Sequence, residues 1–281
     1  MFFSRTDLAC DSIPKNLKCG DFGGVRLESK QTSGVEIIKM SIITEQGAKV
    51  TKRPIGEYTT IYCGRAWLYE REYVKEIEGV LSSEINKLLT VDGIKSILIC
   101  GLGNKNVTVD ALGPLVIDKL LPAGNSSYNA RKSFLIAPGV QAQSGIEAYD
   151  AVLATSKITN ADAVIVIDAL SSKSLDRLCT TIQISNSGIL PGSGIGNSKK
   201  EISKSTIGIP VISIGVPTVI DSSTLIYETI NEANIDISNE LEEILSNNRN
   251  FFVAPKDIDI IVSSLSSIIA NALNSVIEHK N

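Results

Sequence analysis

The sequence predicts an α/β protein with a mostly parallel, mixed central sheet, helices on both faces of that sheet, and an added N-terminal β hairpin or arm. Four short aliphatic runs lack polar alternation and are typical of strands buried on both faces; they lie at 96–103, 133–140, 163–170 and 210–221. Helical segments at 113–121 and 145–158 separate these runs. Strands that alternate with helices in this way indicate parallel pairing with helices on both sides of the sheet.

The N-terminal part of the chain precedes these runs and has a different pattern. Apolar and polar residues alternate over about 34–62, and turns are expected at Gln46-Gly47 and at Pro54-Ile55-Gly56. This segment therefore predicts a hairpin or extended β-rich arm. In the following stretch, 73–93, apolar residues recur at helical spacing with charges between them, which predicts an amphipathic helix.

Two further segments complete the predicted architecture. The stretch 186–206 is rich in Gly and Ser and is expected to be an exposed loop. The stretch 257–277 has apolar residues at helical spacing and predicts a C-terminal helix packed on the body. No internal repeat and no low-complexity linker marks a domain boundary, so we expect one α/β domain.

Composition excludes several classes of function. The net charge of -4 argues against a direct nucleic-acid partner, because gripping a phosphate backbone needs clustered Lys and Arg. No apolar run is long enough to span a membrane, and Arg5 and Asp7 interrupt the N-terminus before the core of a secretory signal could form. The five cysteines are an odd number without Cys-x-x-Cys spacing, which favours reduced thiols in the cytoplasm.

The chain has a single histidine, His279, three residues from its C-terminal end. Serine and cysteine nucleophiles of the usual kind need a positioned imidazole base. Catalytic zinc sites also commonly include histidine ligands. The sequence therefore favours a mechanism without imidazole and without a metal or other cofactor.

The glycine-rich stretches do not fit nucleotide-binding motifs. Gly101 and Gly103 follow a predicted strand, but Asn106 stands where the dinucleotide fingerprint has its third glycine, and the next strand does not end in an acid. The stretch Gly-Ser-Gly-Ile-Gly at 192–196 lacks both the context and the Gly-Lys-Ser/Thr of a P-loop, so a flexible surface loop is the better interpretation.

Two acids are the candidate catalytic residues. Asp110 follows the first aliphatic strand, Asp168 is expected to end the third, and each precedes Ala-Leu. A lone acid at a strand end is as often a helix N-cap, but the carboxyl ends of parallel strands share one edge, where reactive groups gather. Two carboxyl groups within about 3 to 5 Å of each other share one proton, because repulsion raises one of the two pKa values. One acid can then activate water while the other donates a proton.

Four long motifs carry a family resemblance. They are GLGNKNVTVDALGP (101–114), APGVQAQSGIEAYD (137–150), VIVIDALSSKSLDRLCTTIQISNSGILPGSGIGN (164–197) and GIPVISIGVPTVID (208–221). In this order they resemble the germination protease of endospore-forming bacteria, an atypical aspartic protease. The similarity extends from SRTDLAC near the N-terminus to GVPTVID and covers most of the chain; Val109 stands where the family pattern has proline, and the part after Ile220 matches less well.

The resemblance implies an endopeptidase that degrades the small acid-soluble proteins of the spore core during germination, in the cytoplasm of the forespore or spore. It implies that Asp110 and Asp168 are the two essential acids and that the fold is similar to that of the hydrogenase maturation endopeptidases. It also implies a self-processing zymogen, with cleavage between Asp7 and Leu8 in the acid-aliphatic-small sequence Thr-Asp-Leu-Ala, and a homotetramer. The expected parts are then a pro-segment, 1–7, and one peptidase domain, 8–281.

Three alternatives stay open on the sequence alone. The same acids could be metal ligands in a maturation-type endopeptidase, although no histidine stands at the matching position. The glycine turn could hold an anion or nucleotide in a non-catalytic α/β module. A third, less favoured possibility is a catalytic dyad of Ser171 or Ser172 with Lys173. Residues adjacent in sequence cannot point well toward each other at a strand end, and a solvated loop accounts for these polar residues.

Overall fold

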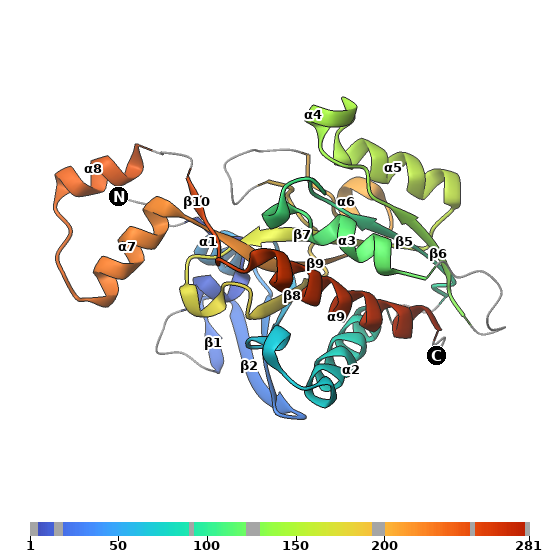
Figure 1. Ribbon diagram of the computed structural model, residues 1–281, viewed down its shortest axis with the longest axis horizontal. Coiled ribbons are helices and arrows are strands. Elements are labelled where there is room, and N and C mark those ends of the chain that lie inside the picture. Colours follow the sequence, from blue (N-terminus) through green and yellow to red (C-terminus); the bar gives the residue numbers. More distant parts are fainter. Residues whose placement is uncertain are drawn as a thin grey trace.

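The molecule is built around one mixed sheet (Figure 1). The structure, a computed structural model, describes residues 5–13, 19–89, 93–121, 130–192, 200–247 and 251–278. The strands are β1 (Gly20–Phe22), β2 (Val25–Thr32), β3 (Val35–Ile42), β4 (Gly56–Tyr62), β5 (Ser96–Gly101), β6 (Lys132–Ile136), β7 (Ala163–Ser171), β8 (Thr181–Ser185), β9 (Val211–Asp221) and β10 (Phe252–Val253). Over these described residues the order is β1-β2-β3-β4-β8-β9-β7-β5-β6, and β10 pairs with the end of β9.

The four aliphatic runs form the parallel part of the sheet. β5 lies between β6 and β7, β7 also pairs with β9, and all three pairings are parallel. Valine, isoleucine and leucine side chains point to both faces of these strands, because helices cover both faces. The predicted α/β class, with its parallel core strands, is confirmed.

The N-terminal strands extend this sheet and do not form a separate arm. β4 pairs antiparallel with β8, which pairs antiparallel with β9, so the β1 to β4 meander is continuous with the parallel strands. The turn expected at Gln46-Gly47 is wrong, since both residues lie in helix α1 (Glu45–Thr51). The Thr44 side chain caps this helix by accepting from the Gly47 amide at 3.1 Å, and such a cap favours helix over turn.

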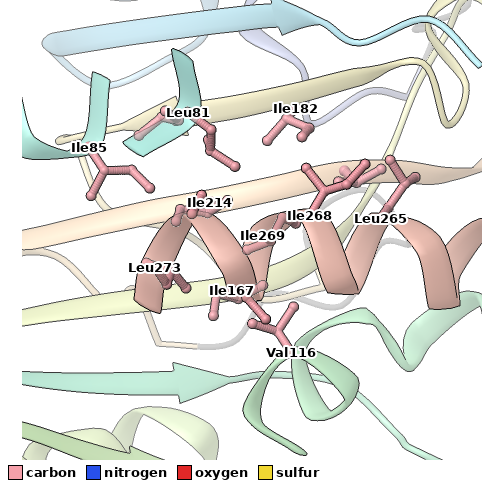
Figure 2. Packing of buried hydrophobic residues seen from close by; sticks show 14 of the residues in the cluster. Leu81, Ile85, Val116, Ile167, Ile182, Ile214, Leu265, Ile268, Ile269 and Leu273 are labelled. Carbon is pink, nitrogen blue, oxygen red and sulfur yellow. The ribbon is translucent and has the colours of Figure 1, made fainter. Parts of the chain in front are cut away.

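Helices cover the two faces unequally. On one face α2 (Arg71–Leu88), α3 (Leu112–Lys119) and α9 (Ile258–Glu278) bury the larger core, and Figure 2 shows α9 packed along β9 with α2 and α3 on either side. On the other face α5 (Ala148–Thr159) and α6 (Lys204–Ile207) cover a smaller core. The helices expected at 73–93, 113–121, 145–158 and 257–277 are confirmed as α2, α3, α5 and α9.

Helix α9 is long and apolar enough to cross a membrane by length and composition, contrary to the expectation that no apolar run is, but 61% of its most apolar window is buried inside the protein. Its apolar stripe faces α2, α3 and the sheet (Figure 2). Hydrogen bonds also connect α3 to α9, since Lys119 Nζ donates to the hydroxyls of Ser266 and Ser267 at 2.6 and 2.9 Å. A core helix of a globular fold explains these features.

The remaining elements lie around the sheet. Helices α7 (Ser222–Glu232) and α8 (Asn239–Ser246) project from the body beyond the end of β9 (Figure 1). The short elements are η1 (Ala9–Ser12), η2 (Ala66–Leu68), η3 (Thr108–Asp110), α4 (Gln141–Ser144) and η4 (Leu175–Arg177). Sequence periodicity did not identify these elements, because each has only three or four residues and a helical pattern of apolar residues needs several turns to be recognised.

The stretch 186–206 differs from the exposed loop that was expected. Its segment 193–199 lies outside the described residues, but Ile189 and Ile202 on either side form a backbone bridge at 2.9 Å in both directions. Ile202 is fully buried, and Gly188, Ile189 and Leu190 line the cavity described below. Two isoleucines in a Gly/Ser-rich stretch therefore anchor it to the body, because burial of their side chains offsets the entropy cost of ordering the loop.

A buried carboxylate ties α2 to the hairpin of β2 and β3. Glu84 is only 4% exposed, and its oxygens contact the Nζ atoms of Lys30, Lys39 and Lys87 at 3.1, 2.6 and 2.7 Å. Burial alone would raise the pKa of Glu84, but the hydrogen bonds from Lys39, Lys87 and Lys30 outweigh it and lower the pKa from 4.5 to about 2.

We expect Glu84→Gln to lower the free energy of unfolding at neutral pH by roughly 1–3 kcal/mol, because charge-assisted hydrogen bonds are lost while the lysines stay hydrated. Since the folded pKa lies below the unfolded one, the contribution is complete above pH 4.5 and is lost as the pH falls toward 2. Urea titrations from pH 7 down to pH 3 measure this difference. Glu76→Gln, an exposed change on the same helix, is the control; a Glu84→Gln deficit that does not shrink at low pH would contradict the account.

Candidate active site

A cavity of about 500 Å³ lies on one face of the sheet, where β7, β8 and β9 meet the N-terminal segment. Both predicted acids line it: Asp110 comes from η3 and Asp168 from β7. Its wall also includes Asp7, and basic side chains of Lys52 and Arg53 stand at another side. Residues from distant parts of the sequence therefore meet around one space.

The glycine turn after β5 positions Asp110. Gly103 has a φ of +108°, and a Cβ there would lie 2.0 Å from the carbonyl oxygen of Asp110, so only glycine allows η3 to fold back so closely. The Asn104 amide donates to Asp110 Oδ2 at 2.7 Å, and the Thr218 hydroxyl donates to the Val109 carbonyl at 2.6 Å. The Gly-x-Gly-Asn turn thus holds a carboxylate of its own chain rather than a nucleotide phosphate.

Asp168 lies within β7 and does not end it, which corrects the expected strand boundary. The strand continues through Ser171 because β9 pairs with it to that point, with a register shift between Leu170 and Ser171. Asp168 is 7% exposed, and its Oδ1 accepts from the following amide, of Ala169, at 3.0 Å. A carboxylate in a strand interior is uncommon, because burial of a charge costs free energy unless its environment compensates.

Polar side chains continue from Asp168 across the neighbouring strands. Asp168 of β7 lies opposite Gly215 of β9, which lies opposite Gln183 of β8, and Gln183 in turn lies opposite Thr60 of β4. Ser213 of β9 and Ser185 of β8 form a neighbouring cross-strand pair. Directly paired residues point to the same face of a sheet. The sequence analysis missed Gln183, Ser185 and Ser213, although the alternation Thr-Ile-Gln-Ile-Ser at 181–185 was a readable signal of a strand with one polar face.

The N-terminal segment reaches this cavity at Asp7, which lines it. The Asp7 amide donates to the Ser171 carbonyl at 2.8 Å, and the Ser171 amide donates to Asp7 Oδ2 at 2.9 Å. The Arg53 Nη2 donates to the Thr6 carbonyl at 2.5 Å. Of the two residues predicted to flank a cleavage, Asp7 lines the same cavity as Asp110 and Asp168, and Leu8 packs against Leu170 of its wall.

Leu8 and Ala9 are fully buried. Leu8 packs against Leu170 and Cys10, with Ile189 at the edge of the same cluster. Ala9 packs in a separate cluster with side chains of β2, β3 and β4. Asp11 anchors the end of the segment through an ion pair with Arg177 and by accepting from the Lys173 amide at 3.0 Å.

The buried cysteines do not fit a role as nucleophiles. Burial raises the pKa of Cys10 to about 11 against the opposing effect of Arg177, and it raises the pKa of Cys63 and of Cys179 to about 12. Burial, and then the nearby charge of Asp168, raise the pKa of Cys100 further still. Thiols of this kind stay protonated at neutral pH and behave as small apolar side chains.

The other candidate groups are not assembled in the described residues. His279 lies outside the described ranges. The Ser172 hydroxyl donates to the Ser174 carbonyl at 2.9 Å, so it caps a turn and does not face a lysine amine. Within the described parts of the chain, no three His, Cys, Asp or Glu side chains gather closely enough to hold a metal ion.

Two aspartates that line a cavity of an α/β sheet beside a stretch of main chain fit one class of protein, the α/β peptidases, although the fold alone does not decide the activity. The comparison with family models narrows this class. The family model described as germination protease matches residues 6–244, and the chain belongs to that family. The chain is therefore an endopeptidase that acts in spore germination, as the sequence motifs predicted.

Relatives support this assignment over their whole length. The germination protease of Clostridium perfringens (strain ATCC 13124) is 35% identical over 314 residues, covering 99% of this chain and 96% of the relative. The germination protease of Priestia megaterium is 32% identical over 339 residues, covering 98% and 91%. A solved NiFe hydrogenase maturation protease, HycI from Thermococcus kodakarensis, superposes with a TM-score of 0.35 and 15% identity, covering 66% of this chain and 98% of that one.

Proposed function

We propose that the chain is a self-processing zymogen that cleaves its own Asp7–Leu8 bond and then degrades small acid-soluble spore proteins, with Asp110 and Asp168 activating water. One observation carries this proposal: the segment around Asp7 and Leu8 is hydrogen-bonded into the cavity that both acids line. The acid of an acid-aliphatic-small sequence lines the same cavity as the two aspartates, which supports a peptidase that cuts its own chain there.

The chemistry needs one ionised and one protonated carboxyl group. The ionised acid accepts a proton from water while the water oxygen bonds to the Asp7 carbonyl carbon, and the carbonyl electrons move to its oxygen. When the C–N bond breaks, the protonated acid gives its proton to the Leu8 nitrogen. The products are a carboxyl group on Asp7 and an amine on Leu8, and the pair ends with one proton, as it began.

The contacts of the segment support a preference for acid, aliphatic and small residues in that order. The Asp7 carboxylate accepts from the Ser171 amide, Leu8 packs beside Leu170, and the small Ala9 side chain is buried among apolar side chains of β2, β3 and β4. An external substrate with the same order of side chains would satisfy the same contacts. Spore proteins carrying such a sequence are the substrates we propose.

The organisation of the protein follows from the same proposal. Residues 1–7 are the pro-segment and residues 8–281 the peptidase domain. Asp7 at the end of the pro-segment lines the site before the cut, so the unprocessed chain has its own segment where an external substrate would bind. We further propose that the enzyme is a homotetramer and that it works in the cytoplasm of the forespore, which becomes the spore core.

Self-cleavage in a chelator tests the proposed chemistry. Purified full-length chain, incubated with a small acid-soluble spore protein in EDTA, is expected to lose residues 1–7 and to produce discrete fragments of the partner at an unchanged rate, because side-chain carboxyls supply the proton transfers. Mass spectrometry identifies the new N-terminus. Loss of cleavage in EDTA with recovery on added zinc would favour a metal-dependent peptidase, and no cut of either protein would favour a non-catalytic module.

A further inference from the structure

We propose that Gln183 binds the scissile peptide, with its side-chain amide donating to the carbonyl oxygen that becomes the oxyanion. This role rests on the proposed cut between Asp7 and Leu8. In this proposal a third residue, on β8, contacts the reacting carbonyl group, in addition to the acids on η3 and β7.

The contacts of Gln183 bracket the Asp7–Leu8 bond. Its Nε2 donates to the Asp7 carbonyl at 3.3 Å, and its Oε1 accepts from the Ala9 amide at 2.6 Å. The side chain is buried, so neither bond is exchanged freely with water. Because one end of the amide must donate while the other accepts, the two bonds together fix which way the group faces.

Main-chain atoms on both sides of the Asp7–Leu8 bond make hydrogen bonds. The Asp7 amide is held by the Ser171 carbonyl, and the Leu8 amide donates to the Thr6 hydroxyl at 3.1 Å. The Asp7 carbonyl, the atom on which negative charge develops during hydrolysis, meets Gln183. The donor therefore lies at the position where an oxyanion needs one.

The sheet register separates Gln183 from Asp168 by one residue without a side chain. Asp168, Gly215 and Gln183 stand side by side on β7, β9 and β8. Neighbouring strands are about 4.8 Å apart, so the backbones of Asp168 and Gln183 are separated by about 10 Å. Gly215 has no side chain, and Leu170 fills the space over it, since a Cβ at Gly215 would lie 2.4 Å from Leu170 Cδ1. Asp168 and Gln183 therefore stand on the same face of the sheet, on either side of this packed position, and Gln183 reaches the Asp7 carbonyl from β8.

The two hydrogen bonds of Gln183 have different consequences for the reaction. The bond to the carbonyl strengthens as the oxygen gains negative charge, so it stabilises the transition state more than the bound peptide. The bond from the Ala9 amide changes little during the reaction, so it contributes to holding the segment. Substitutions that remove one bond and keep the other can separate these effects.

The test compares three variants of the full-length chain by the first-order appearance of the protein that begins at Leu8. Gln183→Glu keeps an acceptor for the Ala9 amide but, when ionised, has no donor for the carbonyl. Gln183→Met keeps the size of the side chain and loses both bonds. Gln31→Glu makes the same charge change on β2, away from the cavity, and is the control.

We expect Gln183→Glu to cleave about 100-fold more slowly than the parent at neutral pH, which is the usual loss for one oxyanion donor. Its rate relative to the parent should recover as the pH falls, because a protonated carboxyl group regains a donor. Hydrogen exchange of residues 7–10 should stay slow in Gln183→Glu and become fast in Gln183→Met, whereas Gln31→Glu should behave as the parent.

The outcomes separate this role from the proposed function. The role of Gln183 would be overturned, with the acid pair left intact, by either of two results. One is a cleavage rate of Gln183→Glu within threefold of the parent rate. The other is a slower cleavage rate that does not change with pH and comes with fast hydrogen exchange at residues 7–10. Parent-like cleavage in both Asp110→Asn and Asp168→Asn would overturn the acid pair while a slow Gln183→Glu still supports the carbonyl contact. If the parent is not cut between Asp7 and Leu8, both proposals fail.

Discussion

Asp168→Asn is expected to reduce cleavage of the Asp7–Leu8 bond and of a spore protein substrate by about 10³- to 10⁴-fold, and Asp110→Asn is expected to do the same. An amide has the shape of the carboxyl group but neither accepts a proton at its oxygen nor gives one up near neutral pH. The hydrogen bonds that position the two side chains survive the change, because Asn Oδ1 can still accept from the Asn104 or the Ala169 amide. The rates are measured by intact mass and by fragment yield.

Asp162→Asn is the matched control for this prediction. Asp162 precedes β7, at the end of the strand opposite the site, and its carboxylate accepts from the amides of Lys95 and Ser96 at 2.9 and 2.8 Å. This variant should lose stability and keep its cleavage rate. The acid-pair account fails if Asp110→Asn or Asp168→Asn keeps more than a few per cent of parental cleavage while remaining folded.

Gly113→Ala is expected to lower the free energy of unfolding by about 3 kcal/mol or more. Gly113 opens α3, directly after the loop that carries Asp110, and a Cβ there would lie 2.3 Å from the Leu102 carbonyl and 2.6 Å from the Ile167 carbonyl. Both oxygens belong to the backbone, one directly after β5 and one within β7, so they cannot turn away as a flexible side chain would. Urea denaturation followed by circular dichroism measures the loss.

Gly79→Ala is the matched control, because the added methyl group would have free space around it. Gly79 is exposed on α2, and its added Cβ has no neighbour within 4 Å. This change should raise the free energy of unfolding by roughly 0.5–1 kcal/mol, since alanine favours helix over glycine. Equal effects at positions 79 and 113 would show that helix propensity, not the close contact between α3 and the sheet, governs position 113.

The sequence predicted the parallel strands well because their pattern is local. Runs such as 163–170 are apolar on both faces, and that pattern fits few structures other than a buried strand. β8 was missed because five alternating residues are a weak signal by themselves, and its position between β4 and β9 is decided by pairing with strands far away in sequence. The boundary of β7 was misplaced for the same reason, since β9 extends it past Asp168.

The site could be predicted only in part. Two acids after buried strands and the absence of other bases led to Asp110 and Asp168, which do line one cavity. The contacts of the N-terminal segment could not be read from the sequence, because Asp7 meets Ser171 and Gln183 more than 160 positions later in the chain. Glutamine also carries no charge that would mark it as a candidate, so Gln183 became visible only through its two hydrogen bonds.

The double variant Asp110→Asn with Asp168→Asn tests most directly whether the two acids work as a unit. The measurement is the first-order rate of appearance of the chain beginning at Leu8, over incubations long enough to quantify the slow single variants. If the two carboxyl groups share one proton and one water, the double variant should be no slower than the slower single variant, because removal of either member already disables the pair. Losses that multiply in the double variant would contradict a shared mechanism.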